Sequence, residues 1–104
     1  MLDSLSDEYD REELAAFIFL LANAKRLAIL EILIQGEISV TELAKRLDIS
    51  QSSLSQHLLP LRLHKIVNIR RDAQFVYYRC DSHQVRYLLD TIHDIWPEIS
   101  KLKR

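Results

Sequence analysis

The sequence of 104 residues predicts a mainly α-helical domain that carries one β-hairpin. There is only one glycine and there are two prolines, so little of the chain is suited to linkers. Apolar residues recur at helical spacing along most of the chain. Across residues 67–80 the pattern changes to β-branched and aromatic residues on both sides of Asp72-Ala73, which is typical of a short hairpin.

Two helices are expected before the middle of the chain. Residues 12–23 carry one apolar stripe, and Asn23 is expected to end this first helix. Residues 24–35 are apolar on most sides, which predicts a central, buried helix. The only glycine, Gly36, follows it, where a helix end favours a positive φ.

The next segment has the pattern of a helix-turn-helix. Ser39 and Glu42 have the spacing of a capping box and open a short helix that runs through Leu47. Residues 48–50 form a tight turn, and Ser50 caps a second helix. That helix buries leucines spaced i, i+4 and i+7 and shows serine and glutamine on its other side. Pro60 is expected to kink or loosen it.

The predicted hairpin follows the helix-turn-helix, so the fold class is a winged helix-turn-helix with the hairpin as its wing. Asp81 or Ser82 is expected to cap a last helix from residue 82 to about residue 102, interrupted by Pro97. The first and last helices offer more apolar surface than a small domain buries alone, which indicates an interface, with core packing as the alternative. The interface residues expected are Leu14, Phe17, Ile18, Leu21, Leu88, Leu89, Ile92, Ile95 and Trp96.

Charge and side-chain chemistry predict that this chain binds double-stranded DNA. Residues 39–79 hold seven positive side chains against three negative, whereas residues 3–13 hold one positive and six negative. Hydroxyls and amides suit hydrogen bonding to base edges in the major groove. The alternative is a polar surface helix among solvated charges. We expect Ser52, Ser55 and Gln56 to read base edges, Gln51 and His57 to assist, and Arg62, Arg70, Arg71 and Gln74 to contact phosphates or the minor groove.

Other classes of protein fit the sequence poorly. Residues 1–104 are expected to form one domain, with residues 1–11 as an acidic, flexible N-terminus. No apolar run approaches the roughly 20 residues that span a membrane, and the acidic start is unlike a signal peptide, so we expect a cytoplasmic protein without a membrane partner. The single cysteine, Cys80, excludes an intramolecular disulfide. No phosphate-binding loop or nucleophile arrangement indicates an enzyme.

Several segments jointly carry a family resemblance. They are Ala-Lys-Arg-Leu-Ala-Ile-Leu at 24–30, Glu-Ile-Ser-Val-Thr-Glu-Leu-Ala at 37–44, Leu-Ser-Gln-His-Leu at 54–58 and Arg-Arg-Asp-Ala-Gln at 70–74. With the order of elements, they resemble the ArsR/SmtB family of winged-helix regulators, in its NolR- and HlyU-like branch. The resemblance implies a homodimer joined through its first and last helices, which acts on a palindromic promoter site, more often as a repressor.

The resemblance also defines two alternatives. Asp81 and His83 match one half of the family's zinc site, whereas Asp94 and Pro97 stand where histidine and glutamate belong, and His93 is one residue out of place. We therefore expect no cofactor. A zinc-responsive sensor of the same fold stays open, with Asp81, His83, His93 and Asp94 as weak candidate ligands. The other alternative is a winged-helix adaptor that contacts only proteins.

Overall fold

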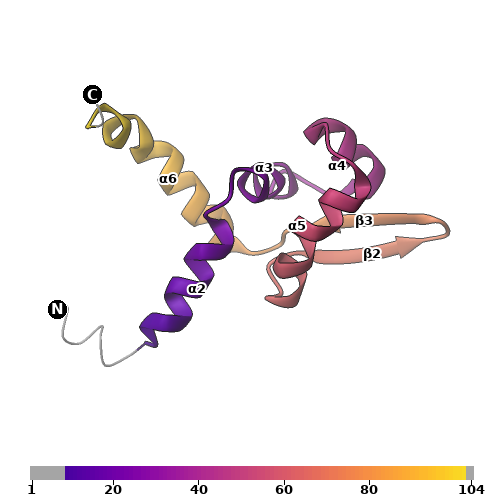
Figure 1. Cartoon of the computed structure of the whole chain (residues 1–104), viewed down its shortest axis with the longest axis horizontal. Coiled ribbons are helices and arrows are strands. Elements are labelled where there is room, and N and C mark those ends of the chain that lie inside the picture. Colours follow the sequence, from indigo (N-terminus) through magenta and orange to yellow (C-terminus); the bar gives the residue numbers. More distant parts are fainter. Residues whose placement is uncertain (1–8, 103–104) are drawn as a thin grey trace.

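The computed structural model describes residues 9–102 and has the predicted winged helix-turn-helix architecture (Figure 1). The expectation of a flexible N-terminus falls mainly on residues 1–8, which lie outside the described residues. In chain order the elements are α2 (Arg11–Leu21), α3 (Ala24–Leu33), β1 (Ile38–Ser39), α4 (Val40–Leu47), α5 (Gln51–Leu63), β2 (Asn68–Asp72), β3 (Phe75–Arg79) and α6 (His83–Lys101).

The helix-turn-helix begins at the two predicted caps. The Ser39 hydroxyl accepts a hydrogen bond from the backbone N–H of Glu42 at 3.2 Å, and the Ser50 hydroxyl accepts one from Ser53 at 3.0 Å. A capping box would also have the Glu42 carboxylate accept from the backbone N–H of Ser39. Here the carboxylate instead lies 3.9 Å from the guanidinium of Arg46. Between the helices, Asp48 takes the left-handed conformation with φ 54° and ψ 48°, which turns the chain sharply into α5.

An elbow separates α2 from α3. Asn23 does more than end the first helix, since its side chain accepts from the backbone N–H of Arg26 at 3.0 Å and so caps α3. The Arg26 side chain in turn donates to the carbonyl oxygens of Leu20 and Phe19 at the end of α2. One arginine therefore fixes the direction in which α2 leaves the body.

Both prolines lie inside continuous helices. α5 runs through Pro60 and α6 runs through Pro97, so the expected interruption of the last helix is wrong. Each proline removes one backbone hydrogen bond, but neighbouring groups hold the turn that follows. The His64 N–H donates to the Pro60 carbonyl at 3.1 Å, and the Ser100 hydroxyl donates to the Pro97 carbonyl at 3.2 Å.

The wing is a three-stranded antiparallel sheet in the order β1-β3-β2, rather than the isolated hairpin expected from the sequence. The two-residue strand β1 pairs with β3 through Ile38 opposite Tyr78. A strand this short carries no readable alternation. Its pairing anchors the base of the wing to the start of the helix-turn-helix.

The core lies where α3, α4 and α5 meet the sheet and the start of α6. α3 is central as predicted, with Ile29, Leu30 and Leu33 at most 1% exposed. Leu21 and Leu89 belong to the same core, at 7% and 1% exposed. The structure therefore places them in the core and not in the interface expected from the sequence, because their apolar surface is already buried within the chain.

The rest of α2 and α6 extends away from the body on the side opposite the wing (Figure 1). These two helices expose much of the apolar surface that the sequence assigned to an interface. None of the helices in residues 9–102 is both long and apolar enough to cross a bilayer. The exposed side chains are Leu14, Ile18, Ile92, Ile95 and Trp96, with Phe17 and Leu88 partly buried.

Candidate nucleic-acid interface

The polar face of α5 is exposed as predicted. Three leucines, Leu54, Leu58 and Leu61, anchor the helix with at most 2% of each side chain exposed. The opposite side presents short polar side chains that can both donate and accept hydrogen bonds. Those exposed are Gln51, Ser52, Ser55 and Gln56, whereas His57 is half-buried.

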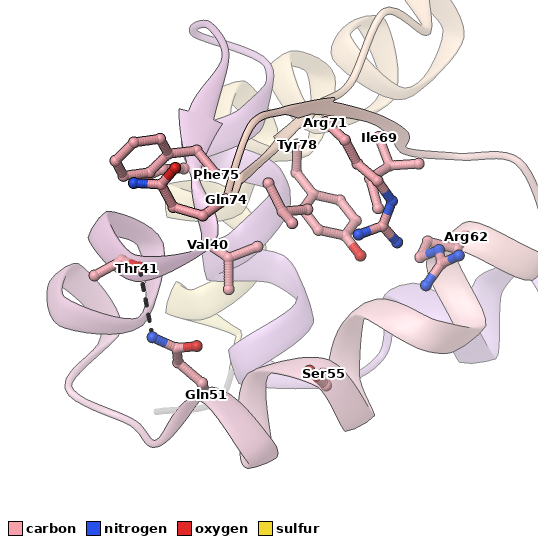
Figure 2. Close-up of a pocket in the computed structure, with 12 residues that line it drawn as sticks. Val40, Thr41, Gln51, Ser55, Arg62, Ile69, Arg71, Gln74, Phe75 and Tyr78 are labelled. Carbon is pink, nitrogen blue, oxygen red and sulfur yellow. Dashed lines mark hydrogen bonds between the residues drawn. The ribbon is translucent and has the colours of Figure 1, made fainter.

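A groove of about 280 Å³ runs between α5, the start of α4 and the inner face of the wing (Figure 2). It brings together five of the residues that the sequence assigned to DNA binding, from three separate elements. Ser55 and Arg62 come from α5, Arg71 from β2, and Gln74 from the wing turn. Gln51 is the fifth, and its side-chain amide donates to the Thr41 hydroxyl at 3.5 Å, a long bond that links the start of α5 to α4.

Two arginines meet at one end of this groove. Figure 2 shows the guanidinium groups of Arg62 and Arg71 turned towards one another beside Tyr78. Within residues 9–102 neither arginine has a carboxylate within ion-pair distance. Two like charges facing the same space favour an anion between them, and a guanidinium suits the oxygens of a phosphate.

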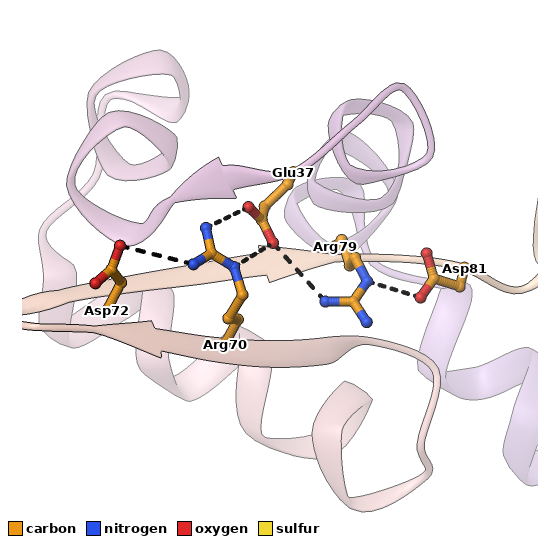
Figure 3. Close-up of polar contacts among 5 residues, drawn as sticks. All are labelled: Glu37, Arg70, Asp72, Arg79 and Asp81. Carbon is orange, nitrogen blue, oxygen red and sulfur yellow. Dashed lines mark hydrogen bonds and ion pairs between the residues drawn. The ribbon is translucent and has the colours of Figure 1, made fainter.

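Arg70 lies on the opposite face of the wing from Arg71, which differs from the expected shared role. Arg71 pairs across the hairpin with Val76, whereas Arg70 pairs with Tyr77, so their side chains point to opposite faces. The guanidinium of Arg70 stacks 4.5 Å from the centre of the Tyr77 ring. Its hydrogen bonds go to Glu37 in the loop before β1 (Figure 3).

Arg70 is part of a connected ion-pair network, the Glu37 network, which also contains Glu37, Asp72, Arg79 and Asp81. Arg70 donates from Nη2 and Nε to the two Glu37 carboxylate oxygens at 2.7 and 3.1 Å. Arg79 Nη1 lies 3.8 Å from Glu37, and Arg79 Nε donates to Asp81 at 2.7 Å. The hydrogen bond from Arg70 lowers the pKa of Glu37 below its ordinary value, and that same bond raises the pKa of Arg70.

The candidate zinc ligands have partners within their own chain. Asp81 is held by Arg79, and His93 Nε2 lies 2.6 Å from a carboxylate oxygen of Glu31 on α3. Within the described part of a single chain, no three histidine, cysteine, aspartate or glutamate side chains gather closely enough to hold a metal ion. The zinc site of the family would draw ligands from two subunits, so the contacts within one chain leave it open as an alternative.

Sequence reasoning missed Thr41, Tyr78 and Phe75, which line the groove, and Glu37, which holds Arg70. The two-residue alternation of a strand would have separated Arg70 from Arg71. The contact from Glu37 joins residues 33 positions apart and has no local sequence signal.

Comparison with known proteins agrees with this architecture. The family model described as bacterial regulatory protein, arsR family, matches residues 23–68, from the cap of α3 to the first residue of β2. The nodulation protein NolR of Rhizobium meliloti is 45% identical over 87 residues, covering 84% of this chain and 71% of that protein. The transcriptional activator HlyU of Vibrio cholerae is 41% identical over 91 residues, covering 86% of this chain and 84% of that protein.

A solved structure extends the similarity to three dimensions. The homodimeric winged helix-turn-helix DNA-binding domain of Mb0332 from Mycobacterium bovis, a possible ArsR-family transcriptional regulator, superposes with a TM-score of 0.74. The two are 29% identical, and the match covers 86% of this chain and 88% of that one. The sequence identity to regulators across most of the chain, and the groove between a polar helix and a wing, lead to one conclusion. This chain belongs to the arsR family of bacterial regulatory proteins and is a DNA-binding transcriptional regulator.

Proposed function

We propose that this regulator is a homodimeric repressor that binds an imperfect palindrome at promoters and places α5 of each subunit in the major groove. The observation that carries the proposal is the exposed serine and glutamine face of α5 beside the groove that holds Arg62 and Arg71. Hydrogen-bonding side chains next to two guanidinium groups suit a ligand with base edges inside and phosphates outside.

The polar side chains of α5 and one arginine of the wing have proposed roles. Ser52, Ser55 and Gln56 read base edges, because they lie on the face turned away from the leucine core. Gln51 and His57 assist them at the two edges of that face. Arg62 and Arg71 bind a phosphate between them and so fix the position of the protein on the duplex.

The dimer forms through the apolar faces of α2 and α6. Their exposed side chains include Ile18 at 53% and Trp96 at 49%, on helices that point away from the wing. The homodimeric state of the Mb0332 domain supports the same arrangement here. Two-fold symmetry then presents two copies of α5 to major grooves roughly 34–36 Å apart, one turn of the duplex.

Selection of bound fragments from random DNA tests the proposal directly. We expect enrichment of a two-fold symmetric sequence whose half-sites are about one helical turn apart. Gln56→Ala is expected to weaken binding to that sequence by about 1–3 kcal/mol and to relax specificity at one position in each half-site. Gln35→Ala removes an exposed glutamine next to α3 and is the matched control. Selection that enriches no sequence, or unchanged binding by Gln56→Ala, contradicts this function.

Two further measurements separate this proposal from its alternatives. Affinity for a DNA reader falls steeply as salt rises, whereas an adaptor that binds only proteins shows no such slope. Repression is tested by transcription in vitro from a promoter that carries the selected site, where added protein is expected to lower transcript yield. A rise in yield identifies an activator. Since a bacterial regulator meets its DNA inside the cell, the proposed place of action is the cytoplasm.

We also propose that DNA binding needs no metal, because Asp81 is paired with Arg79 and His93 contacts the Glu31 carboxylate in their own chain. Calorimetry with zinc on the purified dimer is expected to give no stoichiometric binding. Stoichiometric zinc uptake that is lost in His83→Ala would identify the zinc sensor instead.

A further inference from the structure

Glu37 carries no role in the proposed reading of DNA, yet it organises the positive charge of the wing. It lies in the loop between α3 and β1 and contacts two arginines from different strands, Arg70 of β2 and Arg79 of β3. The bond to Arg70 is bidentate, which is the strongest geometry available to a guanidinium and a carboxylate. Figure 3 shows both arginines turned towards this one carboxylate.

The two arginines are held with unequal strength. Arg79 has a second short bond, to Asp81 at 2.7 Å, so it keeps a carboxylate partner if Glu37 loses its charge. The other carboxylate near Arg70 is Asp72, at 3.9 Å and at the exposed end of β2. The charge of Glu37 therefore decides chiefly whether Arg70 is neutralised within the protein.

The neutralisation of Arg70 bears on DNA binding, because the proposed phosphate-binding Arg71 is the next residue of the wing. A phosphate oxygen and the Glu37 carboxylate compete for the same guanidinium donors. Sequence-independent affinity for DNA rises with the number of phosphates that a protein neutralises, whereas base contacts supply the preference for one sequence. An internal carboxylate that binds a wing arginine lowers the sequence-independent affinity and leaves the preference for one sequence unchanged.

We propose that Glu37 is a specificity-determining residue, which withholds Arg70 from DNA phosphates and so keeps binding to non-cognate DNA weak. The proposal rests on the DNA-reading function above. The wing then contacts the duplex through Arg71 and Gln74, on its groove side, while Arg70 serves the fold by stacking on Tyr77.

Glu37→Gln tests this inference, because it keeps the size of the side chain but removes its charge and one of the two oxygens that accept from Arg70. Affinity is measured by fluorescence anisotropy at several salt concentrations, on the selected palindrome and on a scrambled duplex. Releasing one arginine is expected to steepen the logarithmic salt dependence on the scrambled duplex by about 0.9. We expect several-fold tighter binding there and a smaller ratio of specific to non-specific affinity.

Three companion proteins identify the cause. Glu98→Gln removes the same unit of charge from an exposed carboxylate 3.6 Å from Lys101 on α6, and it is expected to leave the salt slope unchanged. Arg70→Gln alone is also expected to keep the wild-type slope, since Arg70 is already neutralised. The double variant Glu37→Gln/Arg70→Gln is expected to return to that slope. Thermal melting and circular dichroism establish that each variant is folded.

The outcomes separate this inference from the proposed function. A wild-type protein with no salt-dependent DNA binding removes the function itself. Wild-type binding together with an unchanged slope in Glu37→Gln overturns only the role given to Glu37. Weaker binding of folded Glu37→Gln to both duplexes also overturns it, because Glu37 would then support the wing for contact with DNA.

Discussion

The guanidinium of Arg70 donates to both carboxylate oxygens of Glu37, at 2.7 and 3.1 Å, across 33 residues of sequence. This bond joins the outer strand of the wing to the loop that follows α3. With Ile38 paired to Tyr78, it holds the wing against the helix-turn-helix from two sides.

The stability that Glu37 confers is expected to depend on pH. Its pKa in the folded state lies below the ordinary value of 4.5, chiefly because Arg70 donates to the ionised carboxylate. A lowered pKa contributes stability above the unfolded-state pKa, and that stability is lost as pH falls through the folded-state pKa. Glu37→Gln should therefore lower the melting temperature at pH 7 and have little effect once the wild-type carboxyl is protonated. A difference that persists unchanged to pH 3 would rule out the ion pair as its source.

Leu89 and Ile95 lie on the same helix, but substitutions at the two positions are expected to have different effects. Leu89→Ala removes a side chain that is 1% exposed and should cost about 2–5 kcal/mol of unfolding free energy. Ile95→Asp changes a 44% exposed position on the apolar face of α6 and should leave each subunit folded but separate the dimer. Denaturant unfolding and sedimentation velocity measure the two effects.

The single tryptophan makes the same interface visible by fluorescence. Trp96 is 49% exposed on one chain, so dimer formation is expected to bury more of its indole. Its emission maximum should shift to longer wavelength on dilution, at the concentration where sedimentation detects monomers. Emission that stays constant while the dimer separates would place Trp96 outside the interface.

Ala73 occupies a backbone conformation that favours glycine. Its φ is 55° in the turn of the wing, a region that costs a residue with a Cβ roughly 1–2 kcal/mol. Ala73→Gly relieves that strain but adds freedom to the unfolded chain, so we expect a gain of up to about 1 kcal/mol. Ala15→Gly on the exposed side of α2 is the control and should cost about 1 kcal/mol. Urea denaturation compares the two variants.

Cys80 is expected to react slowly with thiol reagents. Its side chain is 8% exposed, and burial raises the pKa of the thiol, so little of the reactive thiolate forms near neutral pH. Ellman's reagent should modify the native protein far more slowly than the protein in denaturant. Equal rates in the two states would contradict the burial of this thiol in the folded protein.

The sequence was sufficient for the helices and for the exposed polar face of α5, because each depends on local rules. Ser39 and Ser50 cap the helices where their spacing predicts, and the i, i+4 and i+7 spacing correctly identifies the buried side of α5. The hairpin was also predictable, since its residue types change abruptly after α5. These features need only the periodicity of a helix or strand and the chemistry of caps and turns.

The remaining features depend on contacts between distant residues. β1 exists because Ile38 meets Tyr78, 40 positions later, and two residues carry no strand pattern of their own. Leu21 and Ile18 have the same character in sequence, but only Leu21 is buried against the body. The separation of Arg70 from Arg71 follows from strand alternation, but the partner of Arg70 does not.

The elbow held by Arg26 has a mechanical consequence. In the proposed homodimer, α2 leaves the body at this elbow and acts as a lever arm between the two-fold axis and the wing. A small bend at Ala22 and Asn23 is magnified into a large displacement at the far end of each subunit. In the proposed dimer, the rigidity of that hinge, rather than any base contact, sets how much variation in operator geometry the regulator tolerates.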